Sequence, residues 1–125
     1  MPVTDEDLDA AAARYAESLP ERLDIAHLGI GPDGHTASLV PGDPVLEVKD
    51  RRVAVTSGEY QGVRRMTLTY PEIEQIRQLL WVVTGEEKVD ALQKLIAEDP
   101  STPSGAMRPK GESLILADRA AAPSL

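Results

Sequence analysis

Short apolar runs alternate with segments of helical periodicity along this chain. The apolar runs predict strands at 23–30, 51–57, 65–70, 79–85 and 113–118. Apolar residues at helical spacing predict helices at 4–19, 71–80 and 86–98, with a further short helix at 36–40. Because strands alternate with helices, we predict an α/β fold in which helices flank a mostly parallel sheet, in a single domain spanning residues 1–125. His27 lies within the first predicted strand, and we expect it to be a packed core residue.

The composition narrows the classes of function. The 125 residues carry a formal net charge of −8, which disfavours binding to a nucleic-acid backbone. Cysteine is absent and no cluster has metal-ligand spacing, so we expect neither a metal nor another cofactor. No apolar run reaches the ~18–20 residues of a membrane span, and the acidic N-terminus lacks the features of a secretory signal. We therefore expect a cytoplasmic protein that acts on a small molecule and binds neither nucleic acid nor a membrane.

Two loops lie where a parallel sheet binds its ligands, at the carboxyl ends of strands. One follows Ile30 and the other follows Val83. In the second loop, Lys88 falls in the first turn of the helix predicted at 86–98, where a positive charge is unfavourable unless an anion lies nearby. A helix N-terminus with a lysine is a natural phosphate site. A solvated lysine that pairs with a neighbouring acid fits these residues equally well.

The first loop is rich in glycine and carries two polar side chains. Gly29, Gly31 and Gly34 permit left-handed backbone and a close approach of a ligand, and they flank Asp33 and His35. His35 precedes the predicted short helix, whose positive end would favour a neutral imidazole. A neutral imidazole can take a proton from water, and a positioned general base contributes typically ~10²–10⁴ in rate. From the loop residues alone, a plain surface turn with an exposed histidine is an equally good interpretation.

The stretch LDIAHLGIGPDGHTASLVPG resembles the signature of the 6-phosphogluconolactonases, which share a superfamily with the glucosamine-6-phosphate deaminases. The later stretches RRMTLTYPEI, LLWVVTGEEK and LILADRAAA match the same pattern in the same order. The resemblance therefore covers nearly all of residues 23–122. It implies a Rossmann-like fold of the deaminase/lactonase type and metal-free hydrolysis of 6-phosphogluconolactone, a phosphosugar lactone of the pentose phosphate pathway.

The resemblance also implies roles for individual residues. His35 matches the general base of the family, and Asp33 matches the acid beside it. Lys88 matches the lysine that binds the substrate phosphate. Arg65 matches an arginine near the substrate, where it would bind the sugar acid or the phosphate, whereas Arg64, Arg51 and Arg52 could as easily be solvated strand ends. Under this hypothesis, backbone N–H groups of the glycine loop at 29–34 would stabilise the oxyanion that forms at the lactone carbonyl.

One position separates the two activities of the superfamily. The deaminase pattern carries a glutamate five residues after the motif histidine, and Val40 occupies that position here. A valine side chain neither titrates nor accepts a hydrogen bond from imidazole. The sequence therefore favours a lactonase over a deaminase.

The chain resembles only the C-terminal half of the family pattern. The Gly/Ser/Thr-rich phosphate loop and the acidic-arginine motif of the N-terminal half are not found in this sequence. We expect the sheet to have a bare edge, which invites pairing with another chain. Three interpretations remain: a half that needs a complementing N-terminal half, a compact lactonase that completes its site as a homodimer, and a non-catalytic phosphosugar-binding relic.

Overall fold

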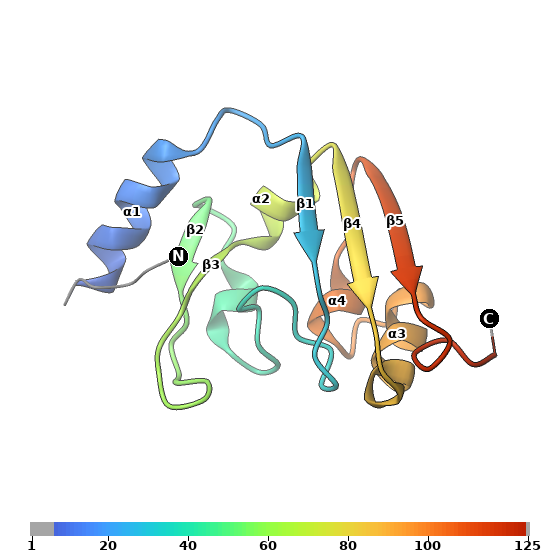
Figure 1. The fold of residues 1–125 in the computed structure, drawn as a ribbon. Helices are drawn as coiled ribbons and strands as arrows, with labels where there is room; N and C mark the ends of the chain where they lie inside the picture. Colours follow the sequence, from blue (N-terminus) through green and yellow to red (C-terminus); the bar gives the residue numbers. More distant parts are fainter. Residues whose placement is uncertain (1–6, 125) are drawn as a thin grey trace.

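A three-stranded parallel sheet lies at the centre of the computed structural model, which describes residues 7–124 (Figure 1). Its strands are β1 (Ile25–Leu28), β4 (Gln78–Val83) and β5 (Glu112–Ala117). β4 lies in the middle and pairs in parallel with both neighbours, with Leu80 opposite His27 on one side and Leu114 on the other. The carboxyl ends of the three strands therefore meet at one edge of the sheet. This arrangement confirms the predicted α/β class and the parallel sheet.

The helical segments are short. They are α1 (Leu8–Ser18), the 3₁₀ turn η1 (Pro44–Glu47), α2 (Tyr70–Glu74), the 3₁₀ turn η2 (Glu86–Lys88), α3 (Val89–Ile96) and α4 (Pro103–Ala106). The side chain of Asp7 caps α1 by accepting a hydrogen bond from the N–H of Ala10 at 3.0 Å. Proline stands in the first turn of η1, α2 and α4, where its missing N–H costs no helical hydrogen bond. The first residues of the helix predicted at 4–19 lie outside the described residues.

Strands β2 (Val53–Val55) and β3 (Met66–Leu68) form a separate antiparallel pair. The segment between them, 56–65, contains no helix. A parallel connection would need a crossover of a dozen or more residues, so these two strands can pair only as a hairpin. Helix α1 packs against this pair (Figure 1), where Ala12 contacts Val53 and Met66 in a small second core.

Two predicted helices are wrong in the structure. Residues 36–40 form a tight turn instead of a helix: Thr36 and Leu39 make an isolated bridge, and Ala37 has a φ of 51°. The helix predicted at 71–80 ends at Glu74, and Leu80, expected on its apolar face, is a residue of β4. Residues 78–83 form a strand because QLLWVV pairs with β1 on one side and with β5 on the other. The hydrogen bonds of these two pairings outweigh a weak helical periodicity.

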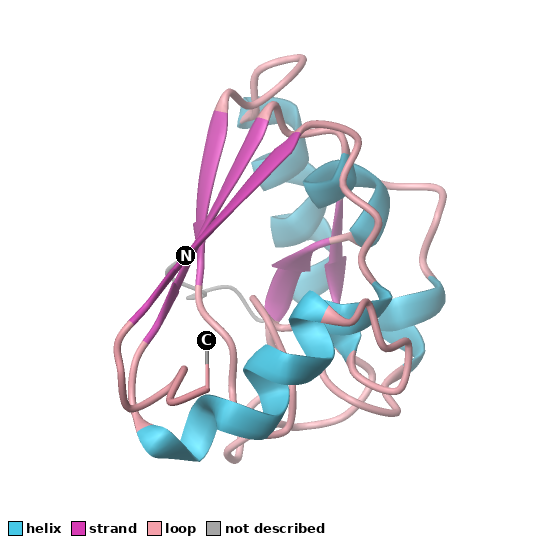
Figure 2. Cartoon of the chain, turned by 90° about the vertical axis from the view of Figure 1, so that its right-hand side faces the viewer, coloured by secondary structure: helices cyan, strands magenta, loops and turns pink. Residues whose placement is uncertain are grey.

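The helices cover only one face of the sheet. Figure 2 shows the strands almost edge-on, with the helices of the described residues on one side. On the covered face, Leu79, Trp81 and Val83 of β4 pack into the main core and are at most 1% exposed. The opposite surface, which we call the bare face, consists of the alternate residues of the same strands, namely Ile25, His27, Gln78, Leu80, Val82, Glu112, Leu114 and Leu116.

Five of the eight residues of the bare face are apolar. Leu114 and Leu116 are about half exposed, and Ile25 is 55% exposed. His27 is also exposed, so the expectation that it packs in the core is wrong. The reason is the alternation of side chains along a strand, which puts His27 on the face that this chain leaves open. Among the described helices, none is long and apolar enough to cross a membrane.

Candidate active site

The loop that follows β1 is held in shape by its own hydrogen bonds. The N–H of Gly31 donates to the carbonyl of His35, and the N–H of Gly34 donates to the carbonyl of Gly31, each at 2.9 Å. The hydroxyl of Thr36 donates to the carbonyl of Gly29 at 2.8 Å. The N–H groups of Gly31 and Gly34 are therefore engaged within the loop and are not free to bind an oxyanion. Their contribution to the site is a rigid frame.

Two glycines of this loop are required by geometry. A Cβ at Gly31 would overlap the imidazole of His35 and crowd the carboxylate of Asp33. Gly34 has a φ of 81°, in the left-handed region that favours glycine, and a Cβ there would collide with Thr102. The first of these contacts shows that the backbone passes directly against the polar pair.

Asp33 and His35 form a close pair at the carboxyl edge of the sheet. Nδ1 of His35 lies 2.6 Å from Oδ1 of Asp33, and the same oxygen accepts the backbone N–H of His35 at 3.1 Å. A carboxylate can only accept, so Nδ1 carries a proton, and in the neutral form of the ring the lone pair lies on Nε2. The His35 side chain is 24% exposed, which leaves it reachable by water. A histidine that a carboxylate holds in this way is able to act as a general base.

The ionisation of Asp33 fits this role. Partial burial would by itself raise the pKa of the carboxyl group, but the hydrogen bonds from the backbone and ring of His35 and the attraction of that ring outweigh it. The pKa of Asp33 is therefore below its ordinary value, and the group is a carboxylate at neutral pH. The helix that was expected to polarise His35 is absent at 36–40, so Asp33 and not a helix end orients the imidazole.

Tyr60 is the site residue that sequence reasoning missed. Its ring meets the imidazole of His35 edge to face, with the centroids 5.1 Å apart, and its hydroxyl lies 3.2 Å from Nδ1. The tyrosine stands 25 residues from His35 in the sequence, in the polar segment GEYQGVR. An aromatic residue within such a segment was the only signal available.

Lys88 reaches the base of the glycine loop. Its Nζ donates to the carbonyl of Ile30 at 2.8 Å. The peptide that carries this carbonyl also carries the N–H of Gly31, which donates to the carbonyl of His35. One peptide unit therefore joins the lysine to the backbone of the histidine. An ammonium has three donor protons, so a bound anion can use those that Ile30 does not.

Arg65 is tied to the tyrosine loop. Its Nε donates to the carbonyl of Tyr60 and its Nη2 donates to Oε1 of Gln61, both at 3.2 Å, and its guanidinium lies 5.7 Å from the centroid of the Tyr60 ring. Arg65, Tyr60, His35 and Asp33 thus form a continuous chain of contacts. Arg65 also borders a hollow of about 800 Å³ between α1 and β3.

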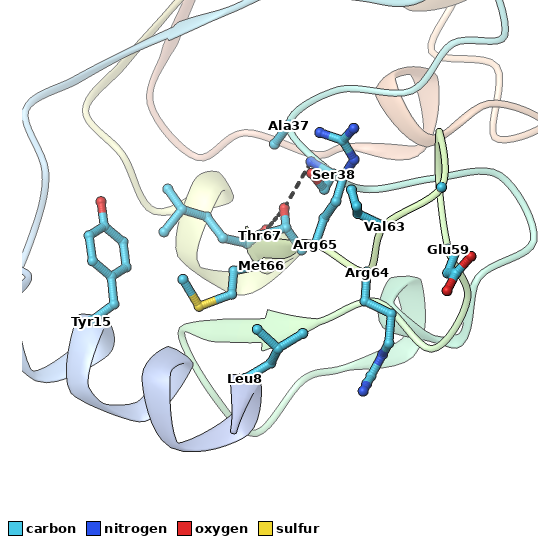
Figure 3. Close-up of a pocket in the computed structure, with 12 residues that line it drawn as sticks. Leu8, Tyr15, Ala37, Ser38, Glu59, Val63, Arg64, Arg65, Met66 and Thr67 are labelled. Carbon is cyan, nitrogen blue, oxygen red and sulfur yellow. Dashed lines mark hydrogen bonds between the residues drawn. The ribbon is translucent and has the colours of Figure 1, made fainter. Parts of the chain in front are cut away.

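That hollow is distinct from the surroundings of the histidine. Figure 3 shows side chains of α1, β3 and the 59–65 loop around it, with the N–H of Ser38 donating to Oγ1 of Thr67 at 3.1 Å. His35, Asp33 and Lys88 do not line it. The structure thus brings Asp33, His35 and the glycine loop together and connects Lys88 to them through the backbone. Arg65 is connected to them only through Tyr60. Within residues 7–124, no three His, Asp or Glu side chains are grouped so as to hold a metal ion.

Comparison with known proteins identifies the family of the chain. Residues 1–116 match the family model described as glucosamine-6-phosphate isomerases/6-phosphogluconolactonase. A 6-phosphogluconolactonase of Nostoc sp. is 36% identical across the whole chain, which corresponds to 57% of that relative. The solved 6-phosphogluconolactonase of Trypanosoma cruzi superposes with a TM-score of 0.82 at 29% identity, over 98% of this chain and 54% of the other.

The fold also occurs in a solved structure that is not described as a lactonase. A monomeric glucosamine-6-phosphate deaminase superposes with a TM-score of 0.78 over 96% of this chain, at 24% identity, which is evidence for the fold alone. In each of these comparisons the chain spans little more than half the length of the relative.

Proposed function

Since this chain belongs to the family of glucosamine-6-phosphate isomerases and 6-phosphogluconolactonases, we propose that it is the base-bearing half of a 6-phosphogluconolactonase. The observation that carries the proposal is the Asp33–His35 pair, which a rigid glycine loop holds at the carboxyl edge of the sheet with Nε2 free of Asp33. Val40 stands where the deaminase pattern has a glutamate, which favours lactone hydrolysis over deamination.

In the proposed reaction, Nε2 of His35 takes a proton from a water molecule. The water oxygen forms a bond to the lactone carbonyl carbon, and the tetrahedral intermediate collapses by breaking the bond to the ring oxygen. The proton held on Nε2 passes to that ring oxygen, which becomes a hydroxyl group. Asp33 stays ionised and stabilises the transient imidazolium across the 2.6 Å contact.

Lys88 is the proposed anchor for the substrate phosphate. It is joined to the base through the Ile30–Gly31 peptide, so its position relative to His35 is set by the main chain. Arg65 is not placed beside Lys88 by any described contact and is committed to the Tyr60 loop. We therefore assign the phosphate to Lys88 and give Arg65 the role of holding Tyr60.

The bare face of the sheet supports the proposal that a further polypeptide packs against this chain. Strands of parallel sheets are usually buried on both faces, and here Leu114, Leu116 and Ile25 are exposed on one. We propose that a polypeptide equivalent to the uncovered half of the relatives packs on this face and supplies the rest of the phosphate site. A homodimer and a non-catalytic relic are the competing possibilities, and solution mass together with a lactone assay separates them.

The decisive experiment is lactone hydrolysis by the 125-residue chain, alone and mixed with the half of a relative that it does not cover. In the active preparation, His35→Ala should lower kcat by about two orders of magnitude. Lys88→Ala should raise KM, whereas Lys94→Ala removes a partly exposed lysine that pairs with Asp90 and should change neither constant. Wild-type turnover by His35→Ala would refute the general-base role, and ammonia release from glucosamine 6-phosphate would favour the deaminase.

A further inference from the structure

The hydroxyl proton of Tyr60 has no acceptor within the described part of the chain. Its oxygen is 3.2 Å from Nδ1 of His35, but the proton on Nδ1 is directed at Asp33, 2.6 Å away. An unprotonated Nδ1 would leave its lone pair facing the carboxylate, which is repulsive. Nδ1 therefore cannot accept from the phenol. The Tyr60 oxygen is at most a second acceptor for the Nδ1 proton, and its own O–H remains available.

The loop that carries Tyr60 is built to hold this hydroxyl in place. At its start, the carboxylate of Asp43 accepts the N–H groups of Ser57 at 3.1 Å and Gly58 at 2.9 Å. At its tip, the N–H of Tyr60 donates to the carbonyl of Val63 at 2.8 Å. Arg65 closes the loop from the other side through the Tyr60 carbonyl and ring. Such a set of contacts is more than a solvated surface tyrosine requires.

Position and chemistry indicate what the hydroxyl binds. The Tyr60 ring lies against the imidazole whose Nε2 activates water, so a substrate that reaches Nε2 also comes within reach of the phenol. A phenol is a neutral single donor at pH 7, which suits a sugar hydroxyl or ring oxygen, whereas a phosphate is better matched by the cation of Lys88.

We propose that Tyr60 contacts the substrate, donating its O–H to an oxygen of the sugar lactone while its ring holds the imidazole of His35. This inference rests on the proposed lactonase function. It supplies a binding residue for the sugar itself, which neither the glycine loop nor Lys88 provides. The same geometry makes Arg65 a positioning residue, acting on the site through Tyr60.

The test compares Tyr60→Phe, which keeps the ring and loses the hydroxyl, with Tyr15→Phe, which removes a phenol on α1. Binding is measured by titrating 6-phosphogluconate and inorganic phosphate into the protein and following the ¹⁵N signals of the imidazoles. His27 on the bare face serves as the internal reference for His35.

For Tyr60→Phe we expect about tenfold weaker binding of 6-phosphogluconate, unchanged binding of phosphate, and a KM for the lactone about tenfold higher at nearly constant kcat. Tyr15→Phe should match the wild type.

The outcomes separate this inference from the proposed function. If Tyr60→Phe binds 6-phosphogluconate as the wild type does, the sugar contact is wrong even where lactone hydrolysis depends on His35. If Tyr60→Phe weakens binding while His35→Ala has no effect on hydrolysis, the contact of Tyr60 with the sugar is supported and the general-base role of His35 is refuted. Equal weakening for phosphate and 6-phosphogluconate would show a general loosening of the loop and overturn the assignment to the sugar. The absence of saturable 6-phosphogluconate binding by the wild type, with and without the complementing half, would overturn the contact outright.

Discussion

The two faces of the central sheet both carry large apolar residues, but their surroundings are opposite. Along β4, Trp81 is 1% exposed on the covered face, while its neighbour Val82 is 38% exposed on the bare face. On β5, Leu114 and Leu116 lie on the bare face and are as apolar as the core. Apolar residues on both faces are therefore a property of the sequence, whereas burial on both faces depends on what packs against each of them.

The candidate site differs from the bare face because it needs little beyond its own loop. Asp33, His35 and the glycines that frame them lie within seven residues, and the hydrogen bonds that join Asp33 to His35 and Gly31 to His35 close inside that segment. The Asp33–His35 pair therefore forms without a partner, while the sheet behind it remains covered on one face only. This contrast explains how the chain can carry the specific motif of the family and yet span about half of its relatives.

The largest expected effect lies on the covered face. Trp81→Ala removes a fully buried side chain from the main core and should lower the free energy of unfolding by about 3–5 kcal/mol. Urea unfolding followed by circular dichroism measures this loss. A loss below about 1 kcal/mol would mean that the covered face is no better packed than the bare one.

Next in size is the effect of charge on the bare face when a complementing half is present. Replacing Leu114 and Leu116 together by lysine puts two charges into the proposed contact and should weaken association at least tenfold, as measured by calorimetry. The covered face offers no corresponding test of association, because the chain's own helices pack against it. Unaltered association would show that the partner binds elsewhere.

A third prediction concerns Asp43, whose side chain lies on neither face of the central sheet. Asp43 caps η1 and accepts the N–H groups of Val45, Ser57 and Gly58, so Asp43→Ala should cost about 1 kcal/mol of stability, with or without a partner. Burial by itself would raise the pKa of Asp43, but these hydrogen bonds and the attraction of Arg64 lower it below its ordinary value.

The pH dependence of that cost follows from the sign of the shift. Because the pKa of Asp43 is lower in the folded chain than in the unfolded chain, its contribution is complete above the ordinary value of about 4 and is lost as pH falls through the folded value. The difference in unfolding free energy between wild type and Asp43→Ala should therefore shrink from about pH 5 downward. A difference that grows on acidification would contradict the depressed pKa.

The smallest effect is expected on the bare face of the chain alone. Leu116→Ser changes a side chain that is 51% exposed, so the free energy of unfolding should stay within about 0.5 kcal/mol of the wild type. Sedimentation at rising concentration provides the control for self-association. A loss comparable to that of Trp81→Ala would show that a second copy already covers this face, and would favour the homodimer.

Sequence patterns predicted the elements that depend on residues close together in the chain. The run LLWVV predicted β4, and the glycine spacing in GIGPDGH predicted a rigid turn that presents Asp33 and His35. Predictions failed where distant partners decide. Residues 36–40 turn instead of forming a helix, because Thr36 bonds back to Gly29 and Ser38 bonds to Thr67. His27 is exposed because no helix of residues 7–124 packs on its side of the sheet.

By itself, the sequence determined the α/β class, the family and the pairing of acid with histidine, since each depends on residues that are neighbours along the chain. Only the tertiary structure decided which residues join that pair, because the contacts of Tyr60 with His35 and of Lys88 with Ile30 bridge 25 and 58 residues. It also decided which face of the sheet is left open. Alternation assigns side chains to two faces, but which of them is covered depends on where the connecting helices pack.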